Sequence, residues 1–165
     1  KLTYIYSLFI DALEMTKTAV VGYGSDIRCD DAVGILTVRA LQERFPDIDT
    51  YEGYNAVDMI NIFNDYEKII LVDAAALDQE PGTFTRARFD HIDMSHDTTF
   101  SHDTNFRMLI PMAKELGYRV PEIVCYLIVP KLLEIGEELS PELQLKMEHL
   151  IDAISHELTE SPTKK

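Results

Sequence analysis

The hydrophobic residues of the chain recur with two different periods, and the two kinds of segment alternate along the sequence. Continuous runs of apolar residues predict buried strands, because a strand that is covered on both faces shows no polar alternation. The clearest run begins at Lys68 and stops on Asp73. The buried strands predicted in this way are 17–23, 68–74 and 122–129, and a shorter strand is expected near 49–53.

Between these runs, apolar residues recur every three or four positions, as they do on one face of a helix. Ser140 and Pro141 fit the N-cap and the first position of the last helix, because proline lacks the N–H that would be unsatisfied there. Gly117 suits the position just after a helix. The predicted helices are 31–45, 56–65, a third from Asp103 or Thr104 to Gly117, and a last one with a core-facing stripe of Leu143, Met147, Leu150, Ile151, Ile154 and Leu158.

In one segment, from Thr83 to Phe89, apolar and polar residues alternate, which predicts a half-exposed antiparallel strand at a sheet edge. Residues 90–103 show no periodicity and are expected to form a loop. That loop contains part of a small repeat, because residues 95–100 (Ser-His-Asp-Thr-Thr-Phe) are followed at once by residues 101–106 (Ser-His-Asp-Thr-Asn-Phe).

Strands that alternate with helices predict an α/β fold: a three-layer α/β/α sandwich whose twisted five-stranded sheet is mostly parallel, with one antiparallel edge strand and helices on both faces. In the common strand order 2-1-3-4-5, the first and third strands are neighbours. Asp31 follows the first strand and Asp73 ends the third. We therefore expect both carboxylates at one crevice, where open α/β sheets bind their ligands.

The length of 165 residues, of which 46% are hydrophobic, allows one domain with a substantial core. We expect this single domain to span 15–165 and the protein to be a monomer. Residues 1–14 are predicted to be an extension outside the core fold, with a packed extra helix as the alternative. Their apolar stretch is too short to span a bilayer, and the acidic residues after it do not suit a signal peptide.

The net charge of −14 and the isoelectric point near 4.6 exclude nucleic acid and anionic membranes as main partners. Lys and Arg are scattered, so no basic cluster offsets this charge. Cys29 and Cys125 lie far apart and follow no metal-ligand spacing. Both are interpreted as reduced thiols of a cytosolic protein.

Several catalytic patterns are absent or incomplete. Gly22-Tyr-Gly24 starts like a dinucleotide fingerprint, but Ile27 occupies the third glycine position. The sequence has no P-loop and no Gly-x-Ser-x-Gly elbow. What remains is Asp31, Asp73 and one histidine of the following loop, a set of ligands that suits a divalent ion with open positions. The plainer interpretations are that such an Asp caps a helix, as expected for Asp30, or forms a turn, and that the histidine is solvated.

These residues carry a family resemblance. Residues 22–34 resemble the Gly-x-Gly-Asn-x-Leu-x-x-Asp-Asp/Glu-x-x-Gly pattern of the nickel–iron hydrogenase maturation proteases, and 69–74 resembles their second motif. The resemblance covers residues 17 to about 156. Two departures concern substrate contacts: Ser25 replaces the usual Asn, and residues 52–55 replace Asp-Gly-Gly-Thr. Further matches in family order are Glu80-Pro-Gly-Thr83, Ser101-His102, Gly117, Val129-Pro130 and Leu139-Ser-Pro141.

The resemblance implies a cytoplasmic endopeptidase that removes the C-terminal tail of a [NiFe]-hydrogenase large-subunit precursor after nickel insertion. It implies a metal-binding set of Asp31, Asp73 and His102, with Asp31 and Asp73 also as the catalytic carboxylates. The partner is the nickel-loaded precursor, which supplies Ni²⁺, and Zn²⁺ or Cd²⁺ can substitute. Because of the repeat His96 is a rival ligand, but counting back from Gly117 and Pro130 favours His102.

Two versions of the mechanism stay open at this point. In one, a bound ion polarises the scissile carbonyl or activates water. In the other, which we favour, the triad recognises the nickel of the substrate and a carboxylate activates water. Two rival functions also remain: a non-proteolytic small-ligand or metal-binding α/β module, and a homologue that binds the large subunit without cutting it.

Overall fold

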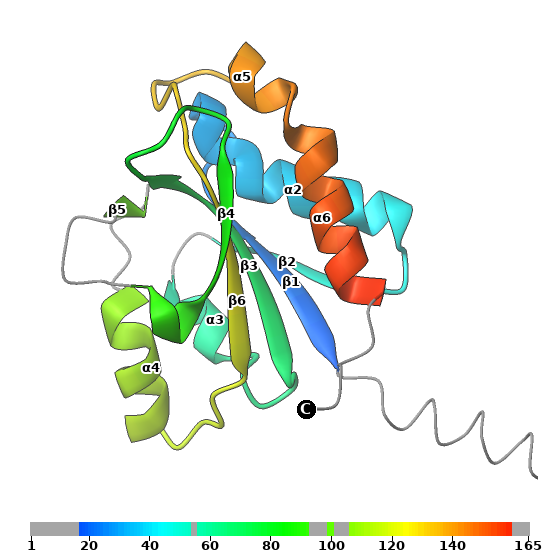
Figure 1. The fold of residues 1–165 in the computed structure, drawn as a ribbon. Coiled ribbons are helices and arrows are strands. Elements are labelled where there is room, and N and C mark those ends of the chain that lie inside the picture. Colours follow the sequence, from blue (N-terminus) through cyan, green and yellow to red (C-terminus); the bar gives the residue numbers. More distant parts are fainter. Residues whose placement is uncertain (1–16, 54–55, 93–98, 101–105, 160–165) are drawn as a thin grey trace, which may run out of the picture.

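The computed structural model describes residues 17–53, 56–92, 99–100 and 106–159 (Figure 1). The predicted extension 1–14 lies outside the described residues, as do His96 and His102.

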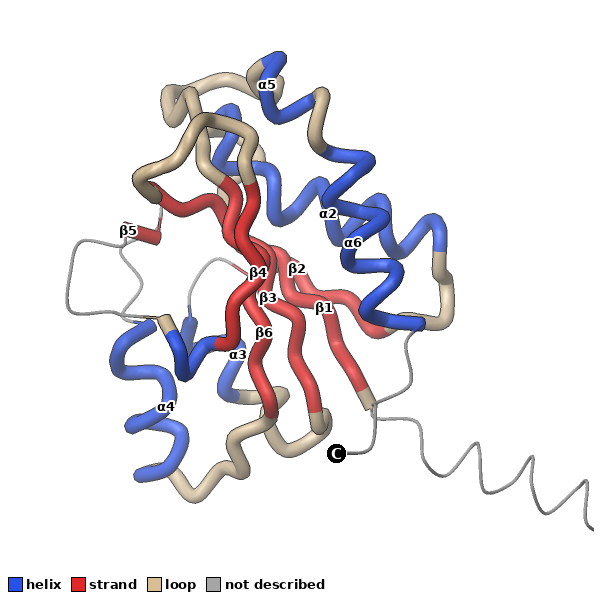
Figure 2. The backbone as a smooth tube through the Cα atoms, viewed as in Figure 1, coloured by secondary structure: helices blue, strands red, loops and turns tan. Residues whose placement is uncertain are grey.

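The described strands form one mostly parallel sheet that runs through the middle of the molecule (Figure 2). The order is β2-β1-β3-β6-β4, with parallel pairing throughout except that β4 runs antiparallel to β6. A two-residue strand, β5, pairs antiparallel with the end of β3. The strands are β1 (Thr18–Tyr23), β2 (Asp49–Gly53), β3 (Lys68–Ala76), β4 (Phe84–Arg88), β5 (Thr99–Phe100) and β6 (Glu122–Ile128).

The predicted sheet is confirmed in its main features, including the antiparallel edge strand and the pairing of the first strand with the third. The edge strand β4 pairs with β6, so the order of the long strands is 2-1-3-5-4, which differs from the common order 2-1-3-4-5 in its last two positions. One strand bound was wrong: β3 continues past Ala74 to Ala76, because Ala75 and Ala76 pair with β5.

Helices cover both faces of the sheet, as predicted for a three-layer sandwich (Figure 1). One apolar cluster packs α2 and α6 against one face, and a second packs α3 and α4 against the other. The helical elements are η1 (Cys29–Ala32), α2 (Val33–Arg44), α3 (Ala56–Ile60), η2 (Phe89–His91), α4 (Phe106–Glu115), α5 (Pro141–Gln144) and α6 (Met147–Thr159).

The helices differ from the prediction mainly at their ends. The first begins as the 3₁₀ turn η1, and α3 stops at Ile60, five residues before its predicted end. The predicted last helix is split into α5 and α6, which leaves Leu145 exposed between them. Its predicted stripe is nevertheless confirmed as core. Gly117 follows α4 with a φ of 79°, a conformation that glycine adopts without strain.

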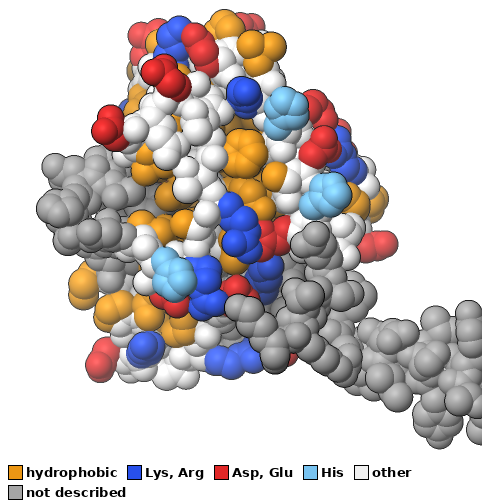
Figure 3. Space-filling model, viewed as in Figure 1, with side chains coloured by type: hydrophobic (Ala, Val, Ile, Leu, Met, Phe, Trp, Pro, Cys, Tyr) orange, Lys and Arg blue, Asp and Glu red, His pale blue; other side chains and the backbone are white. Residues whose placement is uncertain are grey.

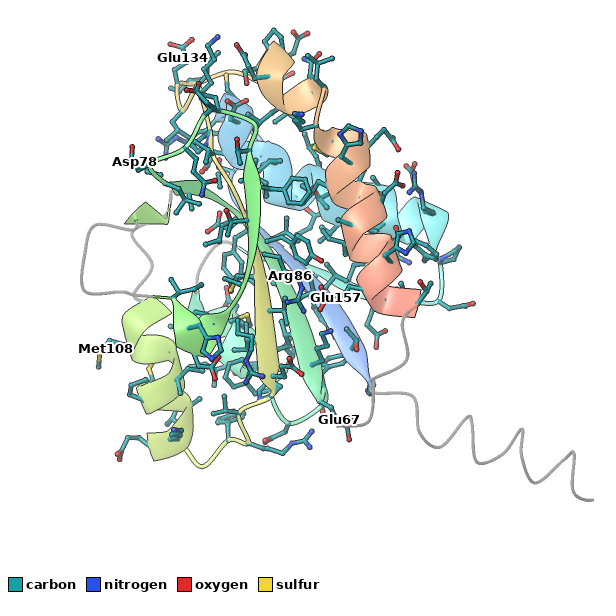
Figure 4. The ribbon with its side chains drawn as sticks, viewed as in Figure 1. Glu67, Asp78, Arg86, Met108, Glu134 and Glu157 are labelled. Atoms are coloured by element: carbon teal, nitrogen blue, oxygen red, sulfur yellow. The ribbon has the colours of Figure 1, made fainter. Side chains whose placement is uncertain are left out.

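A buried carboxylate fixes α6 to the sheet. Glu157 accepts hydrogen bonds from Lys68 Nζ on β3, from the Arg86 guanidinium on β4 and from Tyr126 Oη on β6, all at 2.6–2.7 Å. Figure 4 shows Arg86 and Glu157 facing each other where α6 crosses the sheet. Burial alone would raise the pKa of Glu157, but these donors outweigh it and lower the pKa to about 2.

Cys29 and Cys125 are both buried free thiols. Among the described helices, none has the length and apolar character needed to cross a membrane.

Candidate active site at the carboxyl ends of β1 and β3

Asp73 lies inside β3, with its side chain fully buried. Alternation along the strand puts it on the same face as Ile69 and Leu71, the face that α3 and α4 cover. Its charge affects two buried neighbours. Burial raises the pKa of the Cys125 thiol and of the Tyr23 phenol, and the negative charge of Asp73 raises both further.

Asp31 lies in η1, directly after the loop that follows β1, and it is also fully buried. The loop turns back tightly at Gly24, which has a φ of 138°. A Cβ atom at Gly24 would lie only 1.8 Å from the carbonyl oxygen of Asp31, so a side chain has no room there. Gly24 therefore lets the chain place Asp31 against the end of β1.

The start of α2 then lies directly on the strand that carries Asp73. A Cβ atom at Gly34 would lie 2.5 Å from the carbonyl oxygen of Val72, the residue before Asp73, and 2.2 Å from that of Tyr23. The 3₁₀ turn η1 itself contacts β3. The structure thus places Asp31 and Asp73 at the same end of the sheet, as the sequence predicts. It also gives Gly22 and Gly34 a role in close backbone packing, because a Cβ at Gly22 would lie 2.2 Å from the Gly34 carbonyl oxygen.

Asp30 has a different role from the helix cap expected for it. No side-chain cap is present at η1 or α2. The carboxylate of Asp30 points instead to a loop 101–110 residues further along the chain, where it accepts hydrogen bonds from the backbone N–H groups of Lys131, Leu132 and Ser140 at 2.6–2.8 Å. The hydroxyl of Ser140 also donates to it, at 2.9 Å.

These four hydrogen bonds, which we call the clamp of Asp30, join the segment that carries Asp31 to the loop between β6 and α5. Ser140 holds the N-cap position of α5, as predicted, but its hydroxyl bonds Asp30 rather than its own helix. No local pattern around Asp30 or Ser140 indicates that these two residues pair. The nearest signal is that Leu139-Ser-Pro141 matches the family pattern, but the sequence analysis interprets Ser140 and Pro141 only as a helix start.

The predicted histidine ligand cannot be placed, because His102 and its rival His96 both lie outside the described residues. The described residues between them form β5, which pairs Thr99 with Ala76 and Phe100 with Ala75. Among the described residues, no three His, Cys, Asp or Glu side chains form a metal-binding group. The metal-ligand role of Asp31 and Asp73 therefore stays a prediction.

One residue that departs from the family pattern has a structural partner. Glu52, at the end of β2, accepts two hydrogen bonds of 2.8 Å from the Arg39 guanidinium on α2. This bidentate pair ties α2 to the edge strand beside the site.

Comparisons with known proteins agree with this architecture. The chain is similar to the solved structures of the hydrogenase maturating endopeptidase HybD from E. coli (TM-score 0.72, 18% identity, 88% of this chain and 94% of that one) and of the [NiFe] hydrogenase maturation protease HycI from Thermococcus kodakarensis KOD1 (0.66, 23%, 93% and 99%). A hydrogenase 2 maturation peptidase from Thaumarchaeota archaeon SCGC_AB-539-E09 is also similar (0.65, 24%, 87% and 98%). At these identities the likeness shows the shared fold.

No curated protein matches the chain. A sequence model of a protein family does match, over residues 36–157, a range that includes Asp73 and begins shortly after Asp31. Its description is hydrogenase maturation protease. Because the match covers most of the sequence, this chain belongs to the hydrogenase maturation protease family.

Proposed function

We propose that this protein is a cytoplasmic endopeptidase that removes the C-terminal tail of a [NiFe]-hydrogenase large-subunit precursor once nickel has been inserted. The observation that carries the proposal is the position of two fully buried aspartates, Asp31 and Asp73, at one end of the sheet in a chain of this family. Open α/β sheets bind their ligands at the edge formed by the carboxyl ends of the strands, where these two carboxylates lie.

In this proposal Asp31, Asp73 and His102 recognise the nickel that the precursor carries. Oxygen and nitrogen ligands of this kind suit a divalent transition metal, and three ligands leave positions open for the groups of the substrate. An ionised carboxylate, Asp31 or Asp73, then accepts a proton from the water that attacks the scissile carbonyl. The rigid contact between η1 and β3 holds the two carboxyl-bearing segments for this task.

The direction of β5 supports His102 over His96. Along β5, Thr99 pairs with Ala76 and Phe100 with Ala75, so each step of β5 comes nearer to Asp73 on the partner strand. Phe100, the residue of β5 whose partner lies nearer to Asp73, precedes His102 by two residues in the sequence. Thr99, whose partner lies farther from Asp73, follows His96 by three residues in the sequence.

Cleavage of the nickel-loaded precursor by site variants tests the proposal, with the released tail measured by mass spectrometry. Asp73→Asn should lower the cleavage rate by at least about 100-fold, the usual scale for loss of a general base. Asp31→Glu should retain part of the activity, because it keeps a carboxylate. His102→Ala should lose cleavage and His96→Ala should not.

Melting temperatures within a few degrees of the wild type would show that each variant is folded. Equal losses from the two histidine variants, or none from either, would contradict the triad. Unchanged cleavage by Asp73→Asn would contradict the catalytic assignment.

A further inference from the structure

Four aliphatic side chains are exposed together on two loops at the same end of the sheet as Asp31. Ile27 is 59% exposed and Ile135 is 88% exposed, while Leu132 and Leu133 are exposed by 37% and 38%. We call these four residues the apolar patch. Exposed clusters of this kind on a soluble domain mark interaction sites, because covering each side chain releases water from apolar surface.

The two loops that carry the apolar patch are joined by backbone hydrogen bonds. Arg28 and Gly136 form a parallel bridge, and Gly136 N–H donates to the Ile27 carbonyl at 3.0 Å. The Arg28 guanidinium donates to the Leu133 carbonyl at 3.1 Å. Gly136 also lies against the Cys29 thiol so closely that a Cβ there would be 2.6 Å from Sγ. The patch is therefore built before any partner arrives.

The clamp of Asp30 connects this surface to the candidate active site. Asp30 holds the backbone N–H groups of Lys131 and Leu132, at the beginning of the loop that carries three of the four patch residues. Asp31 directly follows Asp30 in the sequence. A segment bound on the apolar patch is therefore held next to the proposed catalytic end of the sheet.

The rim of the apolar patch is acidic. Glu134, Glu137 and Glu138 are exposed on the same loop, and Figure 4 shows Glu134 at the outer end of the molecule, near α5. Among the described residues, none of these three carboxylates takes part in an ion pair of 4 Å or less.

Two basic residues lie on these loops. Lys131 pairs with Glu142, whereas Arg28 donates to the Leu133 carbonyl and keeps its positive charge, so the three glutamates of the rim outnumber it. Figure 3 likewise shows basic, acidic and apolar side chains close together at the end of the molecule that carries α5. Among the described residues, the surface therefore offers apolar contact together with net negative charge, and it fits a partner that carries both apolar and basic residues.

We propose that the apolar patch docks a segment that carries apolar and basic residues, namely the tail of the precursor that the enzyme removes; this step rests on the proposed function. A second copy of this chain fits less well. Two apolar patches face to face would bring Glu134, Glu137 and Glu138 of both copies together, and like charges at an interface oppose association.

Binding of labelled peptides to the full chain tests the proposal without requiring cleavage. The probes are Lys-Leu-Lys-Ile-Lys-Leu and its charge-reversed form Glu-Leu-Glu-Ile-Glu-Leu, followed by fluorescence anisotropy. The basic peptide should bind at least about 10-fold more tightly than the acidic one. Ile135→Ser, which removes the apolar side chain without adding charge, should weaken its binding by about 10-fold or more.

Leu116→Ser is the matched control, because Leu116 is 62% exposed and follows α4, away from the two loops. Its binding should stay within about twofold of the wild type. Unchanged binding by Ile135→Ser, equal loss in the control, or no binding by the wild type would overturn the proposal. So would a wild-type dimer in sedimentation that Ile135→Ser converts to a monomer, because the patch would then serve self-association.

Kinetics on the precursor separate this proposal from the proposed function. Ile135→Ser should raise KM and leave kcat within about twofold, since docking is not part of the chemical step. Asp73→Asn should lower kcat and leave peptide binding intact. If wild-type protein binds the basic peptide but never cuts the precursor, the proposed function fails and the docking surface stands. An unchanged KM in Ile135→Ser refutes docking of the tail.

Discussion

Removing the carboxylate of Asp30 tests the clamp that connects the site to the loop between β6 and α5. In Asp30→Ala, the N–H groups of Lys131, Leu132 and Ser140 and the Ser140 hydroxyl lose their acceptor. A buried donor left without a partner costs about 1–3 kcal/mol, and water can reach only the part-buried donors at Lys131 and Leu132. We expect a total loss of about 3–5 kcal/mol in the free energy of unfolding.

For a domain of this size, about 1 kcal/mol lowers the melting temperature by 2–4 °C, so Asp30→Ala should melt roughly 10 °C below the wild type. Differential scanning calorimetry and urea denaturation measure this directly. Ser140→Ala is the graded control, because it removes only the hydroxyl donor and should cost about 1 kcal/mol. Asp152→Ala removes an exposed partner of Arg44 and should cost less than about 1 kcal/mol.

The reasoning is refuted if Asp30→Ala melts within about 3 °C of the wild type, or no lower than Ser140→Ala. Either result would mean that the loop is held by other contacts and that Asp30 is not its anchor.

Two other predictions concern the packing of helices on the sheet. Glu157→Gln should cost about 2 kcal/mol of unfolding free energy at pH 7, measured by urea denaturation. The reason is that the pKa of Glu157 is lowered from 4.5 to about 2 in the fold, so its carboxylate stabilises the folded state at every pH above about 4.5. That difference should shrink as the pH falls from about 4.5 toward 2, and a difference that stays constant over this range would refute the charge assignment. Gly34→Ala should cost more than about 3 kcal/mol, because its Cβ would meet the Tyr23 and Val72 carbonyls, while Gly117→Ala should cost only about 1 kcal/mol, from its positive φ alone. Equal losses in the two glycine variants would contradict the close packing of α2 on β1 and β3.

The sequence was sufficient to predict the layers of the fold, because the apolar runs are long and their periods are distinct. The strand of Asp73 is one example, since its apolar residues from Ile69 to Val72 are all fully buried. The edge strand β4 was also predictable, because alternation of exposed and apolar residues needs only local sequence. The position of Asp31 and Asp73 at one end of the sheet followed from the strand order.

Features that depend on distant partners were not predictable in the same way. Asp30 was expected to cap a helix because only its neighbours in the sequence were considered as hydrogen-bond donors, whereas the groups that donate to it lie 101–110 residues further on. The strand β5 has only two residues, too few for any alternation to show. The break between α5 and α6 was hidden because Leu143 and Met147 keep helical spacing across it.

The most direct test of the central claim compares nickel-loaded and nickel-free forms of the same large-subunit precursor. Wild-type protein should release the C-terminal tail from the nickel-loaded form and leave the nickel-free form and unrelated peptides intact, as measured by mass spectrometry of the product. Efficient cleavage of the nickel-free precursor in the presence of a chelator would contradict recognition of substrate nickel by Asp31, Asp73 and His102.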